Sequence, residues 1–104
     1  MLLVTDVYGL TRTFPREEMH GLTAQIRRAA ASVPANIAEG RRYGREFHQF
    51  LGNARCSLME LDTHLELALR VGYVNEGEHI AIQAKLDEVG RILNGLMRSI
   101  SSDI

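Results

Sequence analysis

The sequence contains a single cysteine in 104 residues, and no apolar run approaches the length of a membrane span. Cys56 cannot form an internal disulfide, which is typical of a protein in a reducing cytoplasm. A membrane-spanning helix needs about 20 apolar residues, and the N-terminus MLLVTDVYG lacks the basic lead-in of a secretion signal. We therefore expect a soluble cytoplasmic protein with no membrane segment, in which Cys56 is a small buried packing residue.

Motifs of catalysis and metal binding are also missing. The sequence has no glycine-rich phosphate loop and no HExxH motif, and no spacing of serine, histidine and aspartate marks a nucleophile. A di-iron helical bundle needs two Glu-x-x-His pairs and two further glutamates that point inward, whereas Glu17 and His20 lie in the first turn of a predicted helix. Glu60 and His64, four residues apart, are typical of a helix-surface pair. We expect no catalytic residue, no metal site and no cofactor.

The composition predicts one globular domain spanning residues 1–104. Hydrophobic residues make up 45% of the chain and charged residues 24%, which is close to the average for soluble domains. The net charge of −1 hides an asymmetry, because residues 1–55 carry eight basic and five acidic side chains and residues 56–104 carry four and eight. Eleven of the twelve basic residues are arginine, which suits bidentate contacts with carboxylate or phosphate.

Four helices are predicted, and alternation of period two is nowhere sustained. The first is short and ends at Phe14-Pro15; the second starts at Pro15 and runs to about Tyr43. The third covers about 45–71 and the fourth starts after an Asn75 N-cap, with Glu78 completing a capping box. Gly72 fits the C-terminal stop of the third helix.

Heptad spacing predicts that the last two helices pack antiparallel in an up-and-down four-helix bundle. The third helix carries Leu51, Ala54, Leu58, Leu61, Leu65 and Ala68 at spacings of three and four. The fourth carries Ile82, Leu86, Val89, Leu93, Leu96 and Ile100. Apolar residues off these seams, such as Met59 and Leu67, predict a further interface with other copies of the chain.

The segment 21–40, GLTAQIRRAAASVPANIAEG, combines a helical pattern with a proline and a polar line. Pro34 removes one backbone donor, so we expect a kink or a restart there, with Ser32 as a cap. The polar line faces a matching line on the third helix, and we predict an interior hydrogen-bonded network that fixes helix register. A ligand pocket is the alternative use of the same residues. The predicted network comprises Gln25, Arg28, Ser32, Asn36, Glu39, Asn53, Ser57 and Glu60.

The motif QIRRAAASVPANIAEG, followed by EFHQFLGNARCSLMELDTHLELALRVGYV, resembles the bacterial four-helix-bundle family of 23S rRNA intervening-sequence proteins. The resemblance covers about residue 7 to the end of the chain and implies an up-and-down bundle assembled into a homopentameric ring. A related branch, the accessory protein of diversity-generating retroelements, partners a reverse transcriptase and binds nucleic acid. The chain departs from the family pattern at Cys56, where members usually have glycine.

The densest basic cluster is Arg41, Arg42 and Arg45, with Tyr43 between them. Guanidinium groups suit phosphate contacts, and a tyrosine ring can stack on a base. The alternative is a solvated face paired with nearby acids. From these residues and the resemblance we predict an all-α four-helix bundle with a proline-kinked second helix, assembled as a ring. We expect a non-enzymatic binding or scaffold protein for RNA, DNA or a nucleic-acid enzyme, with a purely structural or protein-interaction module as the alternative.

Overall fold

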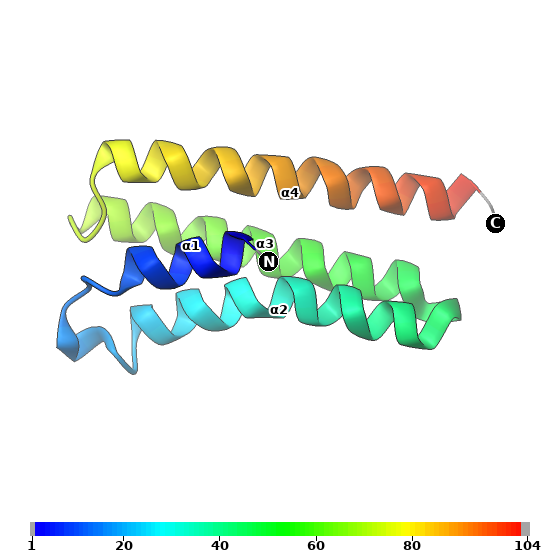
Figure 1. The fold of residues 1–104 in the computed structure, drawn as a ribbon, viewed down its shortest axis with the longest axis horizontal. Coiled ribbons are helices and arrows are strands. Elements are labelled where there is room, and N and C mark those ends of the chain that lie inside the picture. Colours follow the sequence, from blue (N-terminus) through cyan, green and yellow to red (C-terminus); the bar gives the residue numbers. More distant parts are fainter. Residues whose placement is uncertain (1, 103–104) are drawn as a thin grey trace.

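The computed structural model describes residues 2–102, apart from the side chains of residues 45, 101 and 102. Four α-helices, α1 (Leu2–Thr11), α2 (Leu22–Tyr43), α3 (Phe47–Arg70) and α4 (Glu76–Ser102), run along the long axis of a molecule measuring 46 × 24 × 19 Å (Figure 1). The short 3-10 helices η1 (Arg16–Glu18) and η2 (Gly44–Glu46) precede and follow α2. No strand occurs within residues 2–102. The predicted all-α four-helix fold is confirmed, whereas ring assembly stays a prediction.

The core follows the predicted heptad seams. All six seam residues of α3 are buried, and Leu51, Ala54 and Leu61 are completely covered. In α4 the seam is buried at Leu86 and Leu93 but becomes half-buried toward the C-terminal end. The most extensive helix pair is α2 with α3, so this antiparallel pair forms the centre of the bundle.

The turn between α3 and α4 has the predicted chemistry. Gly72 adopts a φ of +86°, a left-handed conformation that favours glycine, directly after α3. The backbone N–H of Glu78 donates to Asn75 Oδ1 at 2.8 Å, and the N–H of Asn75 donates to Glu78 Oε1 at 3.0 Å. This reciprocal pair confirms the capping box at the start of α4.

The second helix differs from the prediction at its start and near Pro34. It begins at Leu22, because Pro15 opens only the 3-10 turn η1 and Gly21 then breaks the helical path at φ −110° and ψ −115°. It continues through Pro34 as one helix, so the expected restart with a Ser32 cap is wrong. A single missing N–H is tolerated where packing on both sides holds the flanking turns. The kink itself stays a prediction.

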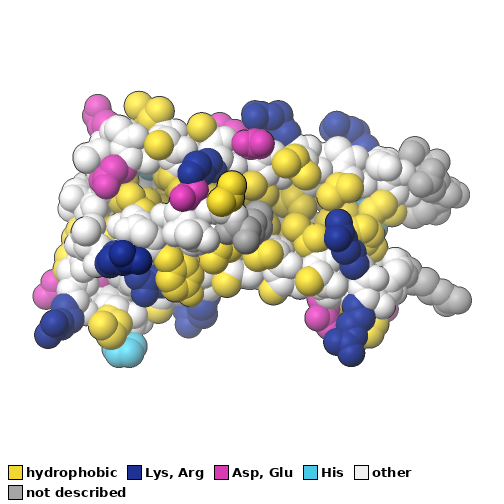
Figure 2. Space-filling view, in the orientation of Figure 1, with side chains coloured by type: hydrophobic (Ala, Val, Ile, Leu, Met, Phe, Trp, Pro, Cys, Tyr) yellow, Lys and Arg dark blue, Asp and Glu magenta, His cyan; other side chains and the backbone are white. Residues whose placement is uncertain are grey.

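Helix α1 is less than half as long as the other three, and it packs between α2 and α4 along only part of the bundle (Figure 1). Within residues 2–102 the backbones of α2 and α4 have no direct contact, and α3 on one side and the shorter α1 on the other each pack against both of them. Figure 2 shows hydrophobic side chains in the space between α2 and α4 beyond the N-terminal end of α1. The half-buried apolar residues at this end of the bundle include Ile37, Phe47, Leu96, Met97 and Ile100.

Candidate nucleic-acid interface

The predicted basic cluster lies at the turn between α2 and α3. Arg41 and Arg42 occupy the last turn of α2 and are exposed, whereas the side chain of Arg45 lies outside the described part of the structure. The ring of Tyr43 stacks on Phe50, with a centroid distance of 6.1 Å and an interplanar angle of 17°. Because 53% of Tyr43 is exposed, its ring remains available to a planar ligand group while Phe50 supports it.

Gly40 allows this turn to be tight. A Cβ at position 40 would lie 2.7 Å from Cδ1 of Phe47 and 2.8 Å from Cβ of Phe50, closer than real Cβ contacts. The end of α2 therefore lies directly against the start of α3, and this contact sets the position of Arg41 and Arg42 relative to Tyr43.

The charge of the molecule is separated along its long axis. The half that contains the α2–α3 turn, residues 33–58 and 90–102, carries six arginines and two glutamates, for a net charge of +4. The other half, residues 2–32 and 59–89, carries six basic and ten acidic side chains, for a net charge of −4. Figure 2 shows most of the visible acidic side chains toward the left-hand end. Counting charges in residues 1–55 and 56–104 does not reveal this separation. Antiparallel helices bring segments that are distant in sequence into the same spatial half of the molecule.

Three members of the predicted polar network meet between α2 and α3. The hydroxyl groups of Ser32 and Ser57 are 2.8 Å apart, and Asn36 Nδ2 donates to Ser32 Oγ at 3.0 Å and to the Ser32 carbonyl at 2.8 Å. All three residues are half-buried. The contact joins the middle of α2 to the middle of α3 and therefore fixes their register.

The prediction that the other five residues belong to an interior network is wrong for the single chain, because their side chains are exposed. The exposed members are Gln25, Arg28, Glu39, Asn53 and Glu60. A helical projection identifies the residues on one line, but it does not tell how far the neighbouring helix reaches across that line. Long polar side chains at the outer edge of the α2–α3 interface stay hydrated, which costs less than burial. Glu60 instead lies 3.5 Å from His64, as expected for a helix-surface pair.

Of the two adjacent arginines in α2, Arg28 was predicted to lie in the interior network, but Arg27 is the one that contacts another helix. Arg27 donates from Nε to Thr11 Oγ1 at 2.9 Å, and its guanidinium lies 4.7 Å from the ring centroid of Tyr8. The buried Thr11 hydroxyl in turn donates to the Val7 carbonyl at 2.9 Å. Arg27 therefore joins α2 to α1, whereas Arg28 is exposed. Tyr8 and Thr11, an aromatic and a hydroxyl side chain in the first helix, are the sequence features that could have indicated partners for Arg27.

Cys56 is exposed, which corrects the expectation of a buried packing residue. It lies between the seam positions Ala54 and Leu58, so its side chain projects away from the core. Within residues 2–102 no cluster of three or more His, Cys, Asp or Glu side chains has the arrangement of a metal site. No helix in that range has both the length and the hydrophobicity to cross a membrane.

A sequence model of the family described as 23S rRNA-intervening sequence protein matches residues 1–95. The chain belongs to this family. The match confirms the resemblance predicted from the motif around Pro34, and it covers both the basic cluster and the Ser32–Ser57 contact. Comparison with curated proteins gives no match.

A solved structure with the same fold confirms the helical architecture. It is the crystal structure of a protein of unknown function from the S23 ribosomal protein family of Bacteroides thetaiotaomicron. The TM-score is 0.78 at 21% sequence identity, and the alignment covers 92% of this chain and 89% of that one. The likeness extends over nearly the whole of both chains and shows a shared fold.

Proposed function

We propose that this protein is a non-enzymatic, cytoplasmic, oligomeric scaffold that binds nucleic acid, either RNA or DNA alone or in the complex of a nucleic-acid enzyme. The observation that carries the proposal is the separation of charge along the bundle. A half with a net charge of +4 attracts phosphate locally although the whole chain is close to neutral.

The α2–α3 turn offers two kinds of contact that unpaired nucleic acid uses. Arg41 and Arg42 are exposed and able to neutralise phosphates, and the exposed ring of Tyr43, supported by Phe50, is able to stack on a base. Neither contact reads a base edge, so we expect modest and nearly sequence-independent affinity. A homopentameric ring would repeat the turn five times, and linked weak contacts then give useful avidity.

The experiment measures binding of arbitrary RNA and DNA as a function of salt. The variant R41Q/R42Q/R45Q removes the predicted cluster, and R12Q/R16Q/R28Q removes the same charge from exposed positions in the other half of the bundle. Each neutralised phosphate contributes a log–log slope of about −0.9 on duplex and about −0.7 on single strands. We expect the first variant to flatten the slope and the second to leave it nearly unchanged, with both folded.

The competing function is a protein-interaction module without a nucleic-acid role. It is favoured by large apolar residues that are more than half exposed on the single chain, namely Met59 at 64%, Ile80 at 70% and Ile92 at 55%. Absence of detectable nucleic-acid binding at about 50 mM salt, with an assembled and folded protein, would replace the first proposal by this one.

A further inference from the structure

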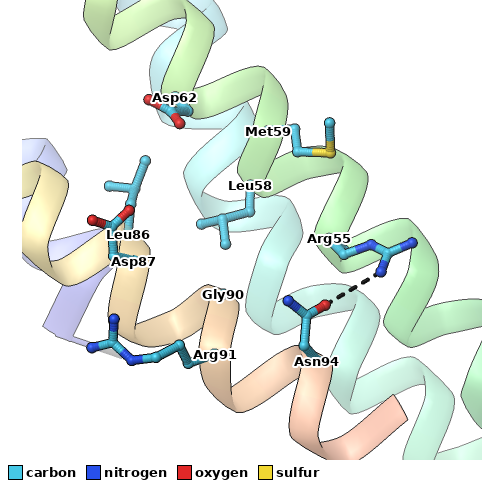
Figure 3. A pocket seen from close by; sticks show the side chains of 9 residues that line it. All are labelled: Arg55, Leu58, Met59, Asp62, Leu86, Asp87, Gly90, Arg91 and Asn94. Atoms are coloured by element: carbon cyan, nitrogen blue, oxygen red, sulfur yellow. Dashed lines mark hydrogen bonds between the residues drawn. The ribbon is translucent and has the colours of Figure 1, made fainter. Parts of the chain in front are cut away.

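A second basic surface lies in the groove between α3 and α4. A hollow of about 650 Å³ is lined by His48, Arg55, Asn94, Met97 and Arg98. An adjoining hollow of about 440 Å³ shares Arg55 and Asn94 with it (Figure 3). In Figure 3 these two side chains point toward each other from α3 and α4, and Arg55 Nη1 donates to Asn94 Oδ1 at 3.3 Å. The two hollows therefore form one groove, which none of the predicted site residues lines.

The charge of this groove changes along its length. The larger hollow has two arginines and a histidine in its lining and no carboxylate. The smaller hollow adds Arg91 but also Asp62 and Asp87, which lie toward the acidic half of the bundle (Figure 3). Within the described residues neither Arg55 nor Arg98 forms an ion pair with a carboxylate. Both guanidinium groups are exposed and available to an external anion.

The spacing of the basic residues suits a strand of phosphates. Arg91 and Arg98 are seven residues apart on α4, as are His48 and Arg55 on α3, so each pair lies on one face of its helix. Seven residues of helix rise about 10 Å, which corresponds to about three phosphates at the 3.4 Å rise of one stacked strand. Two antiparallel rows thus present basic groups on both walls of the groove.

We propose that the groove between α3 and α4 binds the phosphodiester backbone of a single-stranded nucleic acid. Arg55 and Arg98 contact the phosphates from opposite walls, and His48 with Met97 contacts an exposed base face. The inference rests on the proposed function and adds a second contact site to the α2–α3 turn. His48 lies in the first turn of α3, just after that turn, so one strand passes from Tyr43 into the groove. In a duplex the base faces are stacked inside, so they cannot contact the imidazole of His48 or the thioether of Met97.

The test is fluorescence anisotropy of a labelled single-stranded RNA oligonucleotide of mixed sequence, titrated with the assembled protein at several salt concentrations. The groove variant is R55Q/R98Q, the turn variant is R41Q/R42Q, and the control is R12Q/R16Q, which removes two exposed arginines at the opposite end. Circular dichroism and light scattering confirm that each variant is folded and assembled. We expect the groove variant to flatten the log–log salt slope by about 1.4, that is, by about 0.7 for each lost phosphate contact, and the control to leave it unchanged.

The outcomes separate the two proposals. If the turn variant weakens binding while the groove variant behaves as the control, the groove inference is wrong and the proposed function stands. If the parent protein does not bind the oligonucleotide, both fail. In a second arm, unlabelled single-stranded RNA and a duplex of equal phosphate number compete for the labelled strand. Stronger competition by the single strand supports the groove, and equal competition overturns its assignment to single strands.

Discussion

Glu18 joins three parts of the chain through one carboxylate. Its Oε1 accepts a hydrogen bond from the backbone N–H of Leu22 at 3.2 Å, which satisfies a free donor at the start of α2. Its Oε2 accepts from the hydroxyl of Tyr73 at 2.9 Å, and the Tyr73 ring packs against Phe14 with a centroid distance of 5.4 Å. A residue from η1 thereby fixes both the α2 terminus and the α3–α4 turn.

The hydrogen bond to Glu18 raises the pKa of Tyr73 above its ordinary value of 10.0, and partial desolvation and the Glu18 charge act in the same direction. Because the folded pKa exceeds the unfolded one, the contact stabilises the fold below the unfolded pKa and is lost as pH rises through the folded pKa. We expect urea unfolding to show falling stability from pH 10.0 upward. In Tyr73→Phe this part of the alkaline loss is absent, and stability at neutral pH is lower.

Tyr43→Phe is the matched control, because Tyr43 is exposed at the other end of the bundle. The control should keep the alkaline profile of the parent. An unchanged profile in Tyr73→Phe would show that the Tyr73–Glu18 hydrogen bond does not form in solution.

At the scale of helices, local chemistry determined what could be predicted. The α3 seam and the Asn75–Glu78 capping box follow from periodicity and side-chain type alone, and both appear as expected. The start of α2 was placed too early because Gly21 interrupts the expected helix, and helical periodicity does not show at which glycine a helix is interrupted. Arg27 and Arg28 are equivalent in propensity, so only the position of α1 distinguishes them. The α3–α4 groove combines residues more than 40 positions apart, such as His48 and Arg98, and has no sequence motif.

Arg27 is predicted to hold α1 on the bundle. Arg27→Gln removes the hydrogen bond to Thr11 and the cation–π contact with Tyr8, which together should cost about 1–2 kcal/mol of stability. Arg28→Gln, one residue away and exposed, should cost less than about 0.5 kcal/mol. Hydrogen exchange measures the local effect, because α1 should lose amide protection in Arg27→Gln and keep it in Arg28→Gln. Equal protection of α1 in both variants would contradict this role.

At the scale of the whole molecule, the single chain leaves surfaces that assembly would cover. The outer side of α2 carries exposed alanines at positions 31, 35 and 38, at the i, i+4 and i+7 spacing of one helix face. Small residues allow another helix to approach closely. The exposed Met59 and Leu67 on α3 add apolar area. These features support the ring predicted from the family resemblance, in which the basic half of each copy would repeat around the axis.

Light scattering tests the assembly directly. The parent protein should give a species of five times 11.7 kDa, the mass of one chain. Ala35→Arg places a long charged side chain on the outer face of α2, which leaves the core of the bundle untouched and should shift the mass toward a single chain. Ala84→Arg, at an exposed position of α4, carries the same change away from that face and should retain the parent mass. A parent mass of 11.7 kDa that does not change with concentration would reject the ring, and the repeated phosphate contacts would then have to arise within one bundle.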